Sequence, residues 1–151
     1  ILHPAAQPSF RFFRPEGVID RGEWDVPKRP EFANTDGTLV IAFTEIATQT
    51  MIRTPEGRNL VSTGRVWLVP ETGEVRMTEL RVSDYSLNGV VHVAYGHHDN
   101  FDLPVPLAMA ERYENRLNKM QVVDGFATYS NFRKVEVQVE EQIAIPQIED
   151  K

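Results

Sequence analysis

Cysteine is absent from the 151 residues, which excludes disulfides, thiolate nucleophiles and zinc sites with cysteine ligands. The absence does not decide the compartment, because a cysteine-free chain suits the cytoplasm and an oxidising periplasm equally. The sequence also lacks any run of about 18 apolar residues, so no membrane span is predicted. Since the chain starts at Ile1 rather than Met, we expect it to be part of a longer precursor whose signal peptide would be invisible here.

A net positive charge and the common catalytic motifs are missing as well. The formal net charge is -6, and the basic residues are scattered among acids, which disfavours a nucleic-acid partner. The sequence contains no Gly-x-Ser-x-Gly elbow, no phosphate-binding glycine loop and no paired-histidine zinc helix. It therefore gives no support for an enzyme, without excluding one, and predicts no cofactor.

The composition that is present is that of one globular domain. Hydrophobic residues make up 41% and charged residues 25%, which argues against disorder. Residues 1–36 hold five of the ten prolines, so a long helix is excluded there. Within them, Ser9–Arg14 fits a short edge strand, and Gly17–Trp24 and Asn34–Gly37 fit turns. We expect a single β-rich domain over residues 1–151.

Alternating apolar residues then begin at Thr38 and predict strands. Leu39, Ile41 and Phe43 start the first long run, and Thr54–Gly57 is a turn. The clearest local pattern is a hairpin. Its strands are Gly64–Val69 and Glu74–Ser83, and its turn is Pro70–Gly73.

The second half of the chain continues this pattern less regularly. Val90–Tyr95 is a predicted strand that follows a turn region at Asp84–Gly89, whereas the polar segment Gly96–Pro106 is predicted to be a loop. A turn at Val122–Gly125 is expected to precede a strand at Phe126–Phe132.

Two further segments are less clear-cut. Leu107–Leu117 has helix-forming composition, but neither helical nor strand spacing gives it a clean apolar face. Val135, Val137 and Val139 alternate with polar residues, which is typical of a strand with one solvated face.

The segment His97-His98-Asp99 is the most suggestive cluster for metal binding, because imidazole and carboxylate groups are common ligands. Adjacent residues of an extended chain point in opposite directions, however, so these two histidines share an ion only if the segment is a loop. The competing interpretation is a solvent-exposed loop without a metal. A metal-dependent or acid/base hydrolase that uses this loop is therefore the alternative function.

Charged residues interrupt the predicted strands. Paired carboxylates can act in acid/base catalysis, but the simpler interpretation is cross-strand ion pairs on the solvated face of a sheet, each contributing roughly 0.2–1 kcal/mol. The residues concerned are Glu45, Arg65, Arg76, Glu79, Arg81, Glu111 and Arg112.

Aromatic side chains in the predicted strands either fill the core or line a pocket for an apolar ligand. The candidate ligand-binding residues are Trp67, Tyr95, Phe126 and Tyr129, with Phe132 nearby.

An ordered set of short segments resembles a known superfamily. Gly64–Glu79 reads Gly-Arg-Val-Trp-Leu-Val-Pro-Glu-Thr-Gly-Glu-Val-Arg-Met-Thr-Glu, with an aromatic strand, a Pro-x-Thr-Gly turn and a return strand that carries a basic residue and a glutamate. Val90–Tyr95, Leu103–Pro106 and Asp124–Arg133 follow in order. The set resembles the outer-membrane lipoprotein carrier and lipoprotein-sorting superfamily. It is also similar to uncharacterised C-terminal regions of secreted acidobacterial proteins.

The resemblance implies a mainly β fold, a strongly curved antiparallel sheet or incomplete barrel with few or no long helices. It decides in favour of a strand at Leu107–Leu117 and implies a periplasmic or secreted protein. It also implies a hollow for lipid acyl chains, although the proline-rich residues 1–36 cannot form the long N-terminal helix that lines such a hollow. We therefore expect a non-enzymatic domain that binds a hydrophobic ligand, a lipid or a protein partner. A structural module of a larger chain is the remaining alternative.

Overall fold

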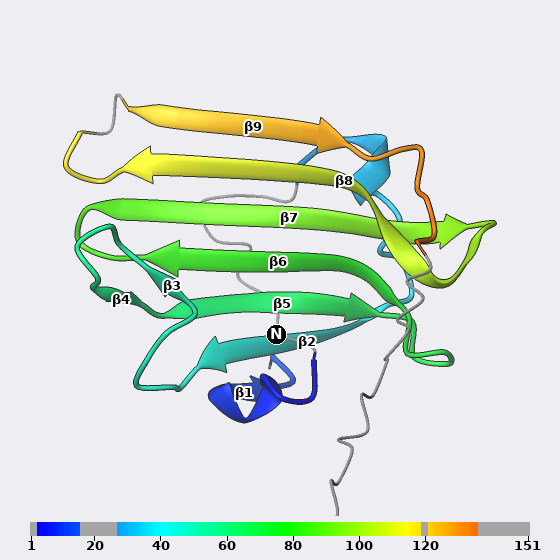
Figure 1. Cartoon of the computed structure of the whole chain (residues 1–151), viewed down its shortest axis with the longest axis horizontal. Helices are drawn as coiled ribbons and strands as arrows, with labels where there is room; N and C mark the ends of the chain where they lie inside the picture. Colours follow the sequence, from blue (N-terminus) through cyan, green and yellow to red (C-terminus); the bar gives the residue numbers. More distant parts are fainter. Residues whose placement is uncertain (1–2, 16–26, 119–120, 136–151) are drawn as a thin grey trace, which may run out of the picture.

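The computed structural model describes residues 3–15, 27–118 and 121–135, and strands dominate them (Figure 1). Helical structure in this part of the chain is limited to two 3-10 turns, and no helix there is long and apolar enough to cross a membrane. The elements in order are η1 (Gln7–Ser9), β1 (Phe10–Phe13), η2 (Pro30–Phe32), β2 (Leu39–Glu45), β3 (Ile52–Arg53), β4 (Asn59–Leu60), β5 (Ser62–Leu68), β6 (Val75–Ser83), β7 (Leu87–His98), β8 (Phe101–Asn115) and β9 (Val122–Thr128).

Seven of the strands form one open antiparallel sheet in the order β1-β2-β5-β6-β7-β8-β9. Strands next to each other in the sequence are also neighbours in the sheet, except where the β3–β4 hairpin is inserted between β2 and β5. This hairpin is a separate two-stranded sheet that lies in front of the large one in Figure 1. The predicted fold class, mainly β with a curved antiparallel sheet that does not close and few or no long helices, is confirmed for the described residues.

The strand register divides the side chains between two faces, because alternate residues of a strand point to opposite sides. Arg65 pairs with Glu79, which pairs with His92, and this row lies on the side that Phe32 covers. We call this side the Phe32 face. The neighbouring residues Leu80 and Val91 pair on the opposite side, beneath the β3–β4 hairpin, which we call the hairpin face.

The main apolar core lies on the Phe32 face. Ala94 and Ala108 form a cross-strand pair in the middle of the sheet, and their small side chains leave room for larger ones above them. Phe32 occupies this space with only 3% of its surface exposed. Burial of a phenylalanine side chain contributes about 1.5–3 kcal/mol. Other members of the cluster are Trp67, Met77 and Ala110.

A second apolar cluster fixes the other end of the sheet. Phe10, Phe43 and Val66 are buried together across β1, β2 and β5, and the first two rings meet edge to face at 5.7 Å. Phe43 also lies over its cross-strand partner Gly64. A Cβ at Gly64 would lie 2.4 Å from the Phe43 ring and 2.0 Å from the Glu79 carbonyl oxygen. The close approach of ring and backbone therefore requires glycine here.

The predicted loop at Gly96–Pro106 is wrong. β7 extends to His98 and β8 begins at Phe101, so a short turn at Asp99 and Asn100 joins two long strands. Proline is tolerated in β8 because β9 ends at Thr128, opposite Ala108. Pro104 and Pro106 lie beyond that point, where within the described residues β8 pairs with β7 alone and the register shifts beside Pro106. Proline within a sheet is confined to such edge segments and bulges.

Two predicted boundaries are wrong at the C-terminal end of the sheet. Val122–Gly125 is the first part of β9 rather than a turn, and the strand stops at Thr128 rather than continuing to Phe132. Gly125 does not take a positive φ there; instead, the side chain of Glu111 covers it, with Oε1 2.5 Å from where a Cβ would stand. The predicted turn region at Asp84–Gly89 is shorter than expected, because β7 already starts at Leu87.

The remaining predictions of local structure mostly hold. Leu107–Leu117 is a strand as far as Asn115, not a helix. Ser9–Arg14 contains the edge strand β1, and the turns with Gly37, Gly57 and Gly73 have the expected positive φ angles. The predicted turn at Gly17–Trp24, residues Val137 and Val139 of the alternating segment, and the positions after them lie outside the described residues.

Candidate functional site

A buried ionic cluster centred on Glu79 lies on the Phe32 face. The Glu79 carboxylate accepts hydrogen bonds from Arg65 Nε at 2.9 Å and from Arg65 Nη2, and from Arg81 Nε at 2.8 Å and Nη2 at 3.2 Å. His92 Nε2 lies 3.0 Å from Glu79 Oε2. Glu79 and His92 are 1% and 2% exposed, so water does not screen the cluster.

These contacts keep the Glu79 carboxylate ionised. Burial acts to raise its pKa, but the hydrogen bonds from its three partners act in the opposite direction and hold the pKa far below its usual value. The prediction that such charges mark a solvated face is wrong for Arg65 and Glu79, which are buried. They lie on neighbouring strands and satisfy each other through hydrogen bonds.

The other predicted strand charges have different roles. Arg112 forms the expected exposed cross-strand pair with Asp124 at 3.2 Å. Glu45 is buried and accepts hydrogen bonds from the backbone N–H groups of Met51 at 2.7 Å and Ser62 at 3.1 Å. It therefore anchors both ends of the β3–β4 insertion. Arg76 pairs with Glu74 at 3.3 Å, and Glu111 accepts a hydrogen bond from the Tyr113 hydroxyl at 3.1 Å.

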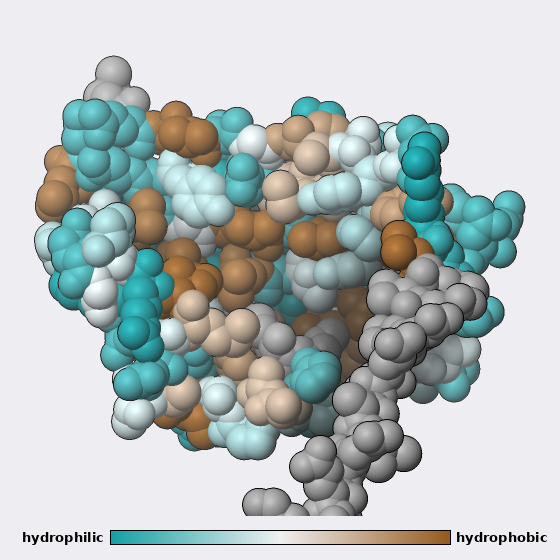
Figure 2. All heavy atoms as spheres, viewed as in Figure 1, coloured by the Kyte–Doolittle hydropathy of each residue, from teal (hydrophilic) through white to brown (hydrophobic). Residues whose placement is uncertain are grey.

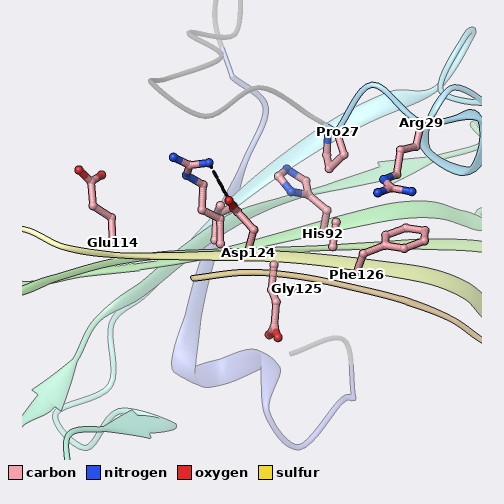
Figure 3. A pocket seen from close by; sticks show the side chains of 11 residues that line it. Pro27, Arg29, His92, Glu114, Asp124, Gly125 and Phe126 are labelled. Atoms are coloured by element: carbon pink, nitrogen blue, oxygen red, sulfur yellow. Dashed lines mark hydrogen bonds and ion pairs between the residues drawn. The ribbon is translucent and has the colours of Figure 1, made fainter. Parts of the chain in front are cut away.

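A cavity of about 730 Å³ on the Phe32 face is shown in Figure 3. His92 and Phe126 project into it from the sheet, and Arg29 reaches it from the segment before η2. The Arg29 guanidinium lies 3.8 Å from the centre of the Phe126 ring, a cation–π contact. Acidic and basic side chains both line the cavity, including the Arg112–Asp124 pair.

A cavity of about 600 Å³ lies on the opposite side, between the β3–β4 hairpin and the sheet. Leu80 and Val91 form its floor, and Ile52 and Leu60 of the hairpin form its roof. In Figure 2, which views this face, apolar residues gather over the middle of the sheet with polar residues around them. Further lining residues are Arg53, Thr54, Pro55, Glu56, Arg58, Val82, Asp84, Tyr85, Ser86, Leu87, Gly89 and Tyr113.

Polar contacts at the rim of this second cavity hold the hairpin against the sheet. Arg58 Nη1 lies 2.8 Å from Asp84 Oδ2, and the guanidinium of Arg58 stands over the Tyr85 ring at 4.8 Å. The hydrogen bond from the Ser86 backbone N–H is the largest cause that lowers the pKa of Asp84; burial opposes it, and the contacts with Arg58, the Ser86 hydroxyl and the Leu87 N–H lower the pKa further. The rim therefore carries an ion pair above an apolar interior.

The structure does not bring the predicted ligand-binding aromatic residues together. Trp67 belongs to the core, and Phe126 lines the 730 Å³ cavity. Tyr95 lines a smaller cavity of about 490 Å³, together with the turn between β5 and β6 and the start of β8. Tyr129 lies beyond β9 and donates to Met109 Sδ at 3.5 Å. The floor residues Leu80 and Val91 were missed, although their alternation with Val82 and Val93 is visible in the sequence.

The candidate metal ligands are separated as well. His97 Nε2 lies 2.5 Å from Glu74 Oε1, whereas the His98 ring packs edge-on against Phe101 and Phe132 at 5.6 and 5.3 Å. Asp99 occupies the turn between β7 and β8. Among the described residues, no three histidine, aspartate or glutamate side chains are grouped so that they could hold a metal ion.

Comparisons with protein-family models, with curated proteins and with solved structures find no match for this chain.

Proposed function

We propose that this domain binds an apolar or amphiphilic small molecule in the cavity between the β3–β4 hairpin and the sheet. The observation that carries the proposal is the cavity itself, about 600 Å³ in volume with Leu80 and Val91 as its floor. Small-molecule sites typically measure about 300–1,000 Å³ and combine apolar walls with a few polar groups. Here the polar groups are at the rim, in the Arg58–Asp84 pair.

Two further features support a binding role. The hairpin is joined to the sheet through side-chain contacts rather than a strand ladder, so it can separate from the sheet to admit a ligand without breaking the ladder. The sequence resemblance to lipoprotein carriers led to the same expectation of a hydrophobic ligand. The ligand site proposed here uses aliphatic residues of β6 and β7 in place of the aromatic residues expected from the sequence.

The test uses the purified full chain. Native mass spectrometry looks for co-purifying lipid, and titration with the apolar fluorescent probe 1-anilinonaphthalene-8-sulfonate measures binding. Val91→Trp places a large ring on the cavity floor, and we expect it to weaken probe binding by on the order of tenfold or more, about 1.4 kcal/mol. The control is Val93→Trp, two residues along the same strand and face but outside the cavity lining.

Equal probe binding by Val91→Trp and the wild type would argue against the site. A wild-type protein that carries no lipid and does not bind the probe would argue against the function. Circular dichroism and urea unfolding of both variants separate loss of binding from loss of folding.

A further inference from the structure

The two edges of the sheet differ in how well they are protected against pairing with another chain. β1 is four residues long, carries Arg11 and is flanked by Pro8 and Pro15. Charged residues and prolines of this kind block edge-to-edge association. β9 is seven residues long and contains no proline or lysine, and within the described part of the chain it ends the sheet.

The backbone of β9 presents a regular set of groups to a partner strand. The Tyr129 N–H donates to the Leu107 carbonyl at 2.9 Å, and the Gln121 carbonyl accepts from Asn115 at 3.0 Å. Odd-numbered residues thus direct their backbone groups toward β8. The N–H and C=O groups of Val122, Asp124, Phe126 and Thr128 consequently point outward.

We propose that β9 is a dimerisation edge that pairs antiparallel with β9 of a second copy of this chain. This inference does not depend on the proposed ligand. Two-fold symmetry makes the contact self-complementary and lets every outward backbone group of the strand find a partner. It also covers Val123, which is 63% exposed.

Charge selects the register of this pairing. The two-fold axis is perpendicular to the sheet, so the Phe32 faces of the two copies lie on the same side. One residue of β9 must then lie directly opposite its own copy, and this residue marks the position of the axis. An axis at Asp124 would place two carboxylates opposite each other, and an axis at Phe126 would bring together the two Arg29 guanidinium groups that stand over those rings. Like charges in direct opposition are destabilising.

An axis at Gly125 avoids both clashes. It places each Asp124 opposite the partner's Phe126, directly beside the partner's Arg29, so that opposite charges meet on the Phe32 face. Asp124 has an exposed side chain, at 63%, and is able to make this contact while it still pairs with Arg112. The backbone groups of Gly125 point to β8, and those of Asp124 and Phe126 form the intermolecular hydrogen bonds.

The first measurement is the oligomeric state of the full chain by sedimentation velocity over a wide concentration range, together with amide hydrogen exchange. We expect a concentration-dependent dimer. The amides of Asp124 and Phe126 should become protected as the dimer forms, whereas those of Gly125 and Ala127, which bond to β8, are protected at every concentration. A chain that stays monomeric throughout would overturn the proposal.

Charge-swap variants test the register. Asp124→Lys and Arg29→Glu each place like charges across the interface and should weaken dimerisation on the order of a hundredfold. The double variant restores opposite charges and should recover most of the lost affinity. Asp36→Lys, an equal change at an exposed turn residue, is the control for net charge. Unchanged dimerisation in both single variants would overturn this register.

One other outcome would contradict the inference. Residues 136–151 are a second conceivable occupant of the β9 edge. If they cover it, protection of Asp124 and Phe126 will not depend on concentration and will disappear when residues 136–151 are deleted.

Discussion

The two faces of the sheet are built from alternate residues of the same strands, yet one buries a cluster of charges and the other carries an apolar cavity floor. On the Phe32 face, Glu79 is buried with three cationic or polar partners. On the hairpin face, the adjacent residue Leu80 lies in the floor of an apolar cavity. On the Phe32 face buried charges satisfy one another, whereas the cavity of the hairpin face has an apolar floor.

This difference shows that the two faces contribute differently to the strand register. Arg65, Glu79 and His92 meet only in the observed register, since a slip by one residue would move Glu79 to the other face. The rows of leucine and valine on the hairpin face are less selective. The charged face therefore specifies the register, and the apolar face is the one on which we propose a ligand site.

The largest loss of stability is expected from Glu79→Gln, which removes the negative charge at the centre of the buried cluster. The amide cannot neutralise Arg65, so a buried charge loses its partner, and we expect a loss of about 3–5 kcal/mol in the free energy of unfolding. Urea denaturation measures it. The matched control is Glu111→Gln, a glutamate on the hairpin face that accepts one hydrogen bond from Tyr113, for which about 1 kcal/mol is expected. Equal losses in the two variants would contradict the assigned difference between the faces.

The pH dependence of stability tests the contribution of Glu79 on the Phe32 face separately. Because the pKa of Glu79 is lower in the folded than in the unfolded protein, its contribution to stability is complete above the unfolded value of about 4.3. The contribution is lost as the pH falls from there toward the folded pKa. Unfolding free energies measured between neutral and acidic pH should fall more steeply for the wild type than for Glu79→Gln. Parallel curves would show that Glu79 does not supply this dependence.

The smallest effect on stability is expected from Arg58→Ala on the hairpin face. Arg58 pairs with Asp84 at an exposed position, where solvent and salt screen the interaction. The urea midpoint of this variant should stay close to that of the wild type, and high salt should reduce even this difference. A midpoint as low as that of Glu79→Gln would mean that the rim pair, rather than the buried cluster, dominates the stability of the sheet.

Local patterns predicted those parts of the fold in which neighbouring residues decide the conformation. The turn with Gly73 and the strands on either side of it were predicted because glycine allows the positive φ and β-branched residues favour strands. Gly96–Pro106 was misjudged because its prolines and polar residues resemble a loop. Their effect on β8 depends on where β9 ends, which is a property of the assembled sheet.

The candidate site was harder to predict for a similar reason. Arg65, Glu79 and Arg81 were recognised as unusual, but the sequence contains no sign that they are buried or that His92 joins them. That arrangement follows from the register of three strands and from Phe32, which is distant in the chain. The predicted aromatic residues do not form one site, because they occur on both faces and in separate cavities.

The sequence by itself determined that this is a β-rich domain, because periodicity, turns and composition act over a few residues. Only the tertiary structure decided which charges are buried, where the cavities lie and which strands form the edges of the sheet in the described part of the chain. These properties arise from pairing between strands far apart in the chain. Burial and electrostatic energies depend on what surrounds a side chain in space, and the order of residues does not contain that information locally.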